Sequence, residues 1–286
     1  MHARRVGRIM ASMIKVGTSG AGSSATRVAR PAPPHAQSDS RRSADALELT
    51  PADAAHRLGT LDWQRIARDL DDHGNAVITN LLSPLDCGAI ADWYADDALF
   101  RSRVMMASHG FGRGEYKYFS YPLPQLIGTL RESLYPRLAP IANRWNESLR
   151  VAMRYPPTLA QFLARCHAAG QKRPTPLMLQ YGPGDYNCLH QDLYGEWVFP
   201  LQVTILLSQR GADFTGGEFI MTEQRPRMQS RPEVVPLSRG DAVIFAVHHR
   251  PVAGRRGVYR VNLRHGVSRL RTGRRHTLGI IFHDAK

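Results

Sequence analysis

The chain has 286 residues, of which 43% are hydrophobic and 22% are charged, and its formal net charge at pH 7 is +14. Such a composition is typical of a globular protein with enough chain for one large domain or two small ones. No run approaches the roughly 18 apolar residues of a membrane helix. The cysteines, Cys87, Cys166 and Cys188, are odd in number and form no C-x-x-C pair, which argues against a disulfide framework or a zinc site. We therefore expect a cytoplasmic protein without a membrane partner.

The positive charge is concentrated in two segments. Residues 1–38 hold six Lys and Arg and no acid, and residues 225–275 hold thirteen Arg against two acids, a local balance of +11. Such a field attracts polyanions, mainly through phosphate contacts, and the preference for Arg over Lys favours bidentate phosphate recognition. A well-solvated basic surface is the alternative interpretation. Nucleic acid, either DNA or RNA, is the partner that this charge favours.

The first 45 residues are rich in Gly, Ser, Ala, Pro and Arg and show no sustained hydrophobic period. This pattern predicts a disordered basic tail over 1–45. Three alternatives remain open: an organelle transit peptide, a start codon assigned too early, with Met10 or Met13 as the true start, or a basic arm that touches nucleic acid. Residues 46–286 are expected to form a single domain.

The first part of that domain, 46–175, shows mainly helical patterns. A Thr or Ser cap followed by Pro and acids marks two helix starts, and Gly marks one helix end. We expect helices over 50–58, 61–74, 83–97, 125–149 and 158–170, one strand over 75–82, and an extended piece over 100–106. Pro136 and Pro140 should kink or split the longest of these helices.

The stretch "ASHGFGRGEYKYFSYPLP", residues 107–124, is predicted to be a loop. It combines aromatic residues with Arg113 and Lys117, which is expected of a lid that stacks a base and contacts a phosphate, or of an ordinary aromatic packing segment. Its "GFGRG" lacks the Lys-Ser/Thr of a phosphate loop and the preceding strand of a dinucleotide site, so both are excluded. The same two interpretations apply to Trp197.

From residue 176 onwards the hydrophobic period changes to that of short strands separated by Gly, Pro and Arg turns. Eight strands are expected, over 177–181, 186–190, 199–207, 217–222, 233–237, 241–247, 258–267 and 275–283. Regularly spaced short strands favour a double-sheet jelly roll over an open parallel sheet. The predicted fold is therefore α+β, with a jelly-roll (double-stranded β-helix) core over 176–286. The N-terminal helices of 46–175 would pack on one sheet as a support layer.

The stretch "YNCLHQD" contains a candidate metal site. His190 and Asp192 lie two residues apart at a strand end, so their side chains should point to the same side. Taken alone, this pair is a weak signal, because such a triplet often arises by chance and two polar residues on a wet strand face are the more frequent explanation. A third ligand must come from a later strand, which a jelly roll brings close, and the candidates are His248, His249, His265 and His276.

His265 is the preferred third ligand, because Arg275 follows it ten residues later and opens a strongly apolar strand. Two His and a carboxylate on one face of Fe(II) leave positions open for a 2-oxo acid and dioxygen. The far carboxylate of that acid needs a buried Arg. Thr277, two residues along the same strand, would share the inward face with Arg275.

Two alternatives to this assignment remain open. In the first, His249 is the ligand and Arg256 or Arg260 is the anchor, because "HRPVAGRRGVYR" has a similar spacing. In the second, Arg274 replaces Arg275, because a slip of one residue in the strand register exchanges the two faces.

At this point the motifs resemble a known group of enzymes. H190-Q-D192, "DFTGGEF" at 213–219, "GDAVIF" at 240–245, His265 and Arg275 are similar to the Fe(II)- and 2-oxoglutarate-dependent dioxygenase superfamily. Within it, "QYGPGDYNCLHQD" resembles the strand pair of the DNA-alkylation-repair dioxygenases, in which a Tyr nine residues before the first ligand contacts 2-oxoglutarate. That residue is Tyr181 here. The stretch 85–284 resembles a bacterial family described as oxygenases that act on damaged nucleic acid.

The resemblance implies an enzyme with Fe(II) on His190, Asp192 and His265 and with 2-oxoglutarate as cosubstrate. Arg275, Tyr181 and Thr277 are then the candidate cosubstrate contacts. The expected reaction is oxidative demethylation of alkylated bases in nucleic acid. Hydroxylation of a protein, for example at a prolyl residue, or of a small molecule is the alternative within the same superfamily. A non-catalytic cupin-like or nucleic-acid-binding protein is disfavoured, because an empty site has no use for a buried unpaired guanidinium.

Overall fold

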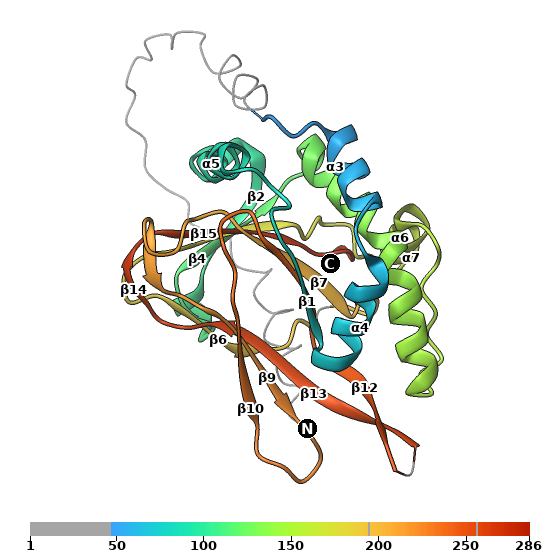
Figure 1. The fold of residues 1–286 in the computed structure, drawn as a ribbon. Helices are drawn as coiled ribbons and strands as arrows, with labels where there is room; N and C mark the ends of the chain where they lie inside the picture. Colours follow the sequence, from blue (N-terminus) through green and yellow to red (C-terminus); the bar gives the residue numbers. More distant parts are fainter. Residues whose placement is uncertain (1–46, 194, 256) are drawn as a thin grey trace, which may run out of the picture. The chain divides into compact units, whose positions relative to one another are not determined.

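The computed structural model describes residues 47–193, 195–255 and 257–286, all within one unit that spans Asp45–Lys286 (Figure 1). The predicted tail over 1–45 and the candidate anchor Arg256 lie outside the described residues. In the part of the chain that is described, no helix combines the length and the apolar character needed to cross a membrane.

Two antiparallel sheets form the core, which confirms the predicted jelly roll. The seven-stranded sheet has the order β1 (Asn75–Ile78), β11 (Ala242–Ala246), β7 (Leu201–Leu206), β15 (Arg275–Ile280), β5 (Leu177–Tyr181), β4 (Glu115–Phe119) and β2 (Phe100–Met105). The six-stranded sheet has the order β10 (Arg231–Val235), β9 (Phe219–Gln224), β13 (Gly257–Val267), β6 (Tyr186–His190) and β3 (Gly112–Arg113), with β12 (His249–Gly254) paired to β13. A small ribbon joins β14 (Leu270–Gly273) to β8 (Phe214–Gly216). Each of the eight predicted strands corresponds to a strand of the structure.

The N-terminal part of the domain contributes more strands than its sequence pattern predicts. The segment 107–124, expected to be a loop, contains β3 and β4, and β4 pairs with both β2 and β5. Glu115 and Lys117 are buried on one face of β4, where charged residues are rare. They are tolerated because Arg103 pairs with Glu115 and because Lys117 Nζ donates to the carbonyl of Tyr94 at 2.8 Å. These charged residues conceal the strand pattern.

Helices form the expected support layer. They are α3 (Pro51–Gly59), α4 (Trp63–His73), α5 (Pro84–Asp92), α6 (Gln125–Ser148) and α7 (Leu159–Ala168), with short 3-10 turns at Trp93–Ala95, Asp97–Leu99 and Met106–His109. Side-chain caps begin the first three: Thr50 accepts from the amide of Asp53, Asp62 from that of Arg65, and Ser83 forms a capping box with Asp86. The expected helix over 83–97 ends earlier, at Asp92. The two prolines inside α6 do not split it.

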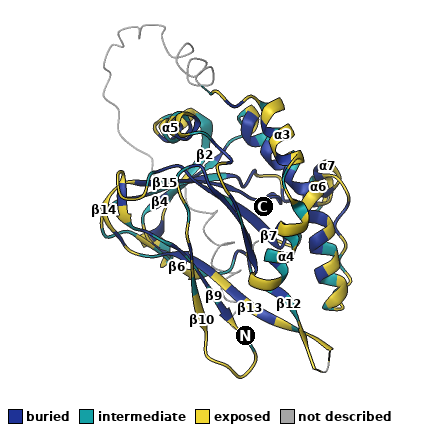
Figure 2. Cartoon of the chain, in the orientation of Figure 1, coloured by how far each residue is buried: buried dark blue, intermediate teal, exposed yellow. Residues whose placement is uncertain are grey.

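The helices cover the seven-stranded sheet. α4 packs on β1 and β11, α6 packs on β15, and α3 packs on α6. Figure 2 shows that the central strands β7 and β15 are buried, whereas the outer ends of the β9–β10 and β12–β13 hairpins are exposed. Aromatic rings fill the layer between helices and sheet, where Tyr135 lies 5.1 Å from Phe199 and 5.6 Å from Phe162, measured between ring centroids. This side of the core is therefore closely packed, and the two candidate histidine ligands, His190 and His265, lie on the other sheet.

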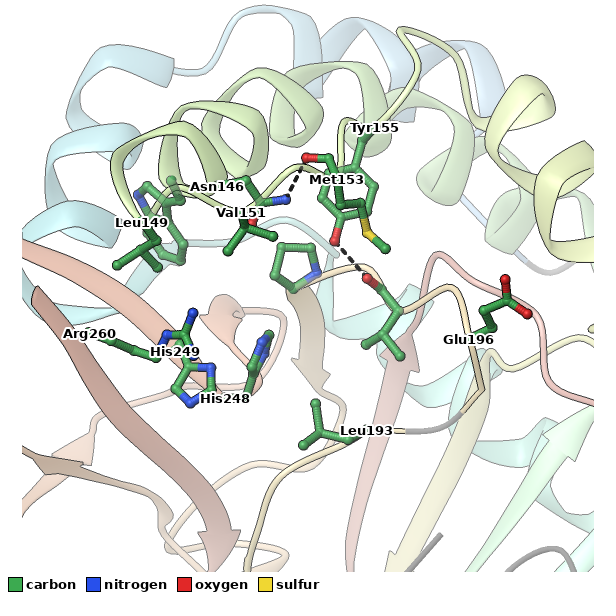
Figure 3. Close-up of a pocket in the computed structure, with 13 residues that line it drawn as sticks. Asn146, Leu149, Val151, Met153, Tyr155, Leu193, Glu196, His248, His249 and Arg260 are labelled. Atoms are coloured by element: carbon green, nitrogen blue, oxygen red, sulfur yellow. Dashed lines mark hydrogen bonds between the residues drawn. The ribbon is translucent and has the colours of Figure 1, made fainter. Parts of the chain in front are cut away.

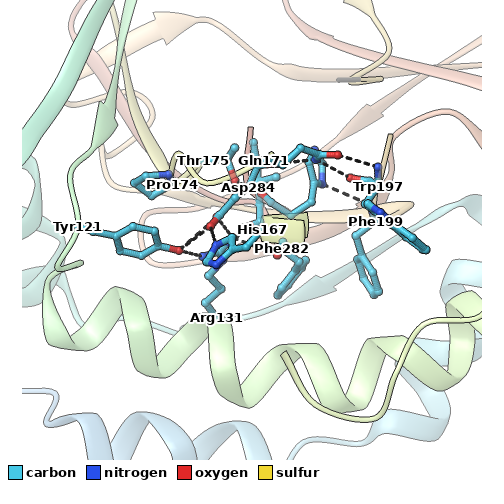
Figure 4. A network of polar contacts seen from close by, with 12 residues as sticks. Tyr121, Arg131, His167, Gln171, Pro174, Thr175, Trp197, Phe199, Phe282 and Asp284 are labelled. Atoms are coloured by element: carbon cyan, nitrogen blue, oxygen red, sulfur yellow. Dashed lines mark hydrogen bonds and ion pairs between the residues drawn. The ribbon is translucent and has the colours of Figure 1, made fainter. Parts of the chain in front are cut away.

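A buried polar network fixes the C-terminal segment to α6 (Figure 4). Arg131 donates from Nη2 to Asp284 Oδ1 at 2.8 Å and to the carbonyl of Phe282 at 3.0 Å. The same carboxylate is contacted by the hydroxyl of Tyr121 at 3.0 Å and by Nε2 of His167 at 2.8 Å. Because Arg131 and Asp284 are both fully buried, solvent does not stabilise their charges, and these contacts must do so.

Candidate active site

Strand register brings His190, Asp192 and His265 together. His190 ends β6 and lies directly opposite His265 on β13, and Asp192 follows two residues after the strand. One possible ligand atom from each of the three lies within 4.8 Å of the others. The close approach of the two strands depends on Gly266, where a Cβ atom would lie 2.7 Å from the carbonyl oxygen of Asn187. Within the described ranges this is the one group of three His, Cys, Asp or Glu residues arranged for a metal ion.

The carboxylate of Asp192 lies between the two imidazoles. Its Oδ1 is 3.4 Å from Nε2 of His190, and its Oδ2 is 3.4 Å from Nε2 of His265. Although burial on its own raises the pKa of Asp192, the neighbouring histidines, His190 first, hold that pKa well below its ordinary value. Burial and the charge of His190 lower the pKa of His265. Asp192 is thus ionised and the neutral form of His265 is favoured, as metal binding requires. Although burial on its own lowers the pKa of His190, the carboxylate of Asp192 raises it, so His190 would release its proton when a metal binds.

Both imidazole rings are held in place. Nδ1 of His190 lies 2.8 Å from the carbonyl oxygen of Cys188, so an Nδ1–H that donates there leaves Nε2 as the ligand atom. The ring of His265 packs 4.5 Å from that of Phe245. His265 and Asp192 are buried, whereas the His190 side chain keeps 31% of its surface exposed. The open side of the cluster is therefore next to His190.

Of the four candidate histidines, His265 is the one that lies in the cluster with His190 and Asp192 in the described part of the chain. His249 lies on β12 opposite Asn262, three residues from His265, and is not part of the cluster. His276 lies on β15, where its Nε2 is 3.0 Å from the side-chain oxygen of Gln180. His265 is thus the histidine that the fold places beside His190.

Arg275 is a buried cation with unused donors. Its guanidinium is almost fully buried, whereas Arg274 is exposed. Arg275 and not Arg274 therefore faces inward, and the one-residue shift of the strand register that would exchange them does not occur. Among the described residues, Nε and Nη1 of Arg275 have no hydrogen-bond partner. Burial lowers the pKa of Arg275 to about 10, which still leaves it charged at pH 7. A ligand with a carboxylate would satisfy this charge.

Tyr181 and Thr277 line the same region. Tyr181 is fully buried and lies opposite Arg275 in the register of β5 and β15, with its ring centroid 5.6 Å from the guanidinium carbon. Thr277 is buried two residues further along β15. Gly217 has a positive φ of 63°, and a Cβ atom there would lie 3.1 Å from Cδ of Arg275 and 2.5 Å from a methyl carbon of Leu270. The "GG" of the "DFTGGEF" motif therefore leaves room for the arginine side chain.

Sequence reasoning missed two features of the site. Tyr116 and Tyr118 share one face of β4, with ring centroids 5.3 Å apart. Burial, and to a lesser degree the charge of Asp192, raises the pKa of Tyr116 and raises that of Tyr118 to about 12. Both tyrosines therefore lie within electrostatic reach of the candidate metal ligands. The Y-x-Y spacing, which matches a strand period, was the available signal.

The second missed residue is Gln191, which lies between the two ligands in sequence. Its Nε2 donates to the carbonyls of His248 at 3.1 Å and Leu263 at 2.8 Å, and so ties the segment after β6 to β13. Trp197 packs partly buried against the core, 5.8 Å from the guanidinium carbon of Arg165. Trp197 was expected either to stack on a substrate base or to pack in the protein interior, and the structure shows it packed against the core.

Two imidazoles and one carboxylate form the donor set that suits Fe(II). The two donors of Arg275 that have no partner in the described chain, Nε and Nη1, suit the distal carboxylate of a 2-oxo acid. The fold and site together define an Fe(II)- and 2-oxoglutarate-dependent oxygenase. The chain belongs to the oxygenase family described as "Oxygenase, catalysing oxidative methylation of damaged DNA", whose model matches residues 114–285.

Relatives with similar sequence are found in Mycobacterium tuberculosis. The uncharacterized proteins MT2286 of strain CDC 1551 and Rv2227 of strain H37Rv are each 51% identical over 167 residues, which cover 58% of this chain and 72% of the relative. A prolyl hydroxylase from Trichoplax adhaerens, solved with a hypoxia inducible factor peptide, is similar at TM-score 0.47 and 15% identity, covering 84% of this chain and 96% of that one. These last values are too low to carry an argument about the substrate.

Proposed function

We propose that the protein removes methyl groups from alkylated bases in nucleic acid, with Fe(II) as cofactor and with 2-oxoglutarate and dioxygen as cosubstrates. The observation that carries this proposal is the cluster of His190, Asp192 and His265, in a fold that also buries the guanidinium of Arg275, whose Nε and Nη1 have no hydrogen-bond partner among the described residues. Buried donors without an acceptor cost stability. An anionic cosubstrate that accepts from them would explain why the chain keeps such a cation in the same domain as a metal donor set.

The roles of the side chains follow from their positions. His190, Asp192 and His265 would hold Fe(II) on one face, and Arg275 would bind the distal carboxylate of 2-oxoglutarate through paired hydrogen bonds. Tyr181 and Thr277 line the same buried region and exclude water from it. When bound, Fe(II) and 2-oxoglutarate supply the oxidising power for C–H hydroxylation. The exposed side next to His190 is where a substrate would enter.

Two observations favour a nucleic-acid substrate. The family description names damaged DNA, and the β9–β10 and β12–β13 hairpins with their flanks carry the exposed arginines Arg227, Arg231, Arg255, Arg260 and Arg264. Transfer of an oxygen atom to an N-methyl group gives an N-hydroxymethyl group, which breaks down to formaldehyde and the free N–H. An oxygenase that acts on a methylated base therefore removes the methyl group.

The test is a product assay with matched histidine variants. We expect protein loaded anaerobically with Fe(II), then given dioxygen and 2-oxoglutarate, to release succinate and formaldehyde when methylated single-stranded DNA is added. The His190→Ala and His265→Ala variants should release neither, because each lacks a metal ligand. His73→Ala, at the exposed end of α4, is the control and should retain activity.

Two other results would change the assignment. Succinate without formaldehyde would retain the oxygenase and indicate hydroxylation of a protein, such as at a prolyl residue, or of a small molecule. If no substrate yields succinate although the protein binds Fe(II), the enzymatic proposal fails and a binding protein is the remaining interpretation.

A further inference from the structure

A second pocket lies outside the triad and the Arg275 region (Figure 3). It has a volume of about 290 Å³, close to the lower end of small-molecule sites, roughly 300 Å³. Three segments form it: the end of α6 with the chain that follows, the segment after Asp192, and the β11–β13 region. The lining residues are Trp145, Asn146, Leu149, Val151, Met153, Tyr155, Leu193, Glu196, Val198, Pro200, His248, His249 and Arg260.

Most of the wall is apolar, and two of its polar groups are already occupied. The side-chain amide of Asn146 donates to the carbonyl of Met153 at 3.1 Å, and the hydroxyl of Tyr155 donates to the carbonyl of Val198 at 2.7 Å. These bonds, drawn in Figure 3, hold the walls together. The indole Nε1 of Trp145 is engaged as well, because it donates to Asp71 Oδ1 at 2.6 Å. The main side-chain polar groups left for a ligand among the lining residues are those of His248, His249, Arg260 and Glu196.

The two histidines are neutral at physiological pH. Burial, with the charges of His249 and Arg260, lowers the pKa of His248 to about 3, and burial with the charge of Arg260 lowers that of His249 to about 4. Their ring centroids lie 4.3 Å apart, and Nδ1 of His248 is buried without a hydrogen-bond partner in the described chain. A neutral imidazole offers one donor and one acceptor, which suits the polar edge of a heteroaromatic ring.

The two charged residues lie at opposite ends of the pocket. Figure 3 shows Arg260 beside the histidines and Glu196 on the far side, beyond Leu193. An occupant is thus favoured if it has an anionic group at one end and N–H or O–H donors at the other. Apolar walls between these ends favour a flat ring system.

This pocket is also connected to the candidate metal site. Leu193, in its wall, directly follows Asp192 in sequence. Gln191 donates to the backbone carbonyl of His248, another wall residue, at 3.1 Å. A ligand in the pocket therefore contacts the same segment that carries the metal ligands.

We propose that this pocket binds one nucleotide of the substrate strand, next to the nucleotide that is oxidised. Its base packs between the apolar walls and pairs with the neutral imidazoles, its phosphate is bound by Arg260, and Glu196 accepts from hydroxyl or amino groups. That the nucleotide belongs to a substrate strand rests on the proposed function. That the occupant is a nucleotide is inferred from the residues that line the pocket.

Adenosine 5′-monophosphate is the probe, and its affinity for the Fe(II)-loaded protein is measured by calorimetry under anaerobic conditions. Arg260→Gln removes the cation, and Leu149→Trp fills the pocket from a partly exposed position at the end of α6. We expect each to weaken binding at least 10-fold. Arg137→Gln, at an exposed position of α6 outside the pocket, is the control and should bind as the unchanged protein does.

The kinetics of methylated single-stranded DNA separate this proposal from the proposed function. We expect Arg260→Gln and Leu149→Trp to raise KM for the DNA several-fold and to leave kcat nearly unchanged. If both variants release formaldehyde with an unchanged KM for the DNA, the pocket does not bind the substrate strand. The proposed demethylase activity would still hold. If both variants lose nucleotide binding but no methylated DNA yields formaldehyde, the pocket is a nucleotide site. The proposed demethylation of nucleic acid is then wrong. Inorganic phosphate that competes as strongly as the nucleotide would also overturn the pocket, because it would leave a simple anion site.

Discussion

Arg275 shows how a single residue can be unfavourable for the fold and necessary for the proposed reaction. Its guanidinium is buried, and Nε and Nη1 have no partner among the described residues. We predict that Arg275→Met raises the free energy of unfolding of the metal-free protein by about 1–3 kcal/mol, because an unsatisfied polar group leaves the core. The same change should abolish the stabilisation that 2-oxoglutarate gives to the Fe(II)-loaded protein.

Urea denaturation with and without 2-oxoglutarate, under anaerobic conditions, measures both effects. Arg274→Met, at the neighbouring exposed position, is the control and should change neither quantity. A less stable Arg275→Met variant that 2-oxoglutarate still stabilises would show that the arginine is structural.

The Arg131–Asp284 pair connects two elements, α6 and the C-terminal segment, and we expect it to contribute strongly to stability. We predict that Asp284→Asn lowers the free energy of unfolding by about 3–5 kcal/mol, because it leaves the buried Arg131 without its counter-charge. The control is Asp69→Asn, which breaks the exposed pair with Arg65 on α4 and should cost less than about 1 kcal/mol. Urea denaturation measures both. Equal effects of the two changes would contradict this role.

At the level of elements, the sequence predicts what depends on local pattern. The strands that became β5 and β6 were predicted with the ends that the structure shows, because the turn sequence "GPGD" at 182–185 separates them. β4 was missed, because its buried Glu115 and Lys117 are paired with residues far away in the sequence. The second pocket could not be predicted, because its walls come from three segments that only the fold brings together.

The sequence favoured His265 and Arg275 over competing residues because of the apolar strand that Arg275 opens. An apolar strand that opens with an arginine indicates that the arginine is buried, and the structure shows that Arg275 is buried and Arg274 exposed. The bonds of Gln191 to His248 and Leu263 could not be predicted in the same way, because their partners have no local sequence signal.

For the whole molecule, buried neutral histidines predict a loss of stability in acid. Burial, with the charge of Arg131, lowers the pKa of His283 to about 4, and burial, with the charge of Arg274, lowers that of His276 to about 4. Because these pKa values lie below the ordinary value of about 6.5, the unfolded chain binds more protons between about pH 6.5 and 4. The stabilisation is thus complete above about pH 6.5 and declines as the pH falls towards 4.

His283→Asn tests this prediction, because it removes the titrating ring and keeps an acceptor for the amide of Phe199, which donates to Nδ1 of His283. We expect urea denaturation of the metal-free protein to show a smaller loss of stability between pH 7 and pH 4.5 in this variant. A difference on the order of 3 kcal/mol is the upper limit for a shift of about 2.5 pH units. Parallel pH profiles for both proteins would show that His283 does not contribute.

The charge of the whole molecule also determines how it should respond to salt. The β9–β10 and β12–β13 hairpins extend on the side away from α3 and α5 (Figure 1), and their regions carry exposed arginines that include Arg227 and Arg264. If these contact phosphates, the logarithm of the affinity for single-stranded DNA falls linearly with the logarithm of the salt concentration, with a slope of about −0.7 per contact. We predict that changing both Arg227 and Arg264 to Gln makes the slope less steep by about 1.4.

Fluorescence anisotropy over a series of NaCl concentrations measures that slope. Arg65→Gln is the control, because Arg65 lies on α4 and is paired with Asp69; its slope should equal that of the unchanged protein. A slope near zero in the unchanged protein would mean that the net charge of +14 does not act on phosphates. The basic surface would then be explained by solvation, and a neutral peptide or small molecule would become the better substrate for the same iron site.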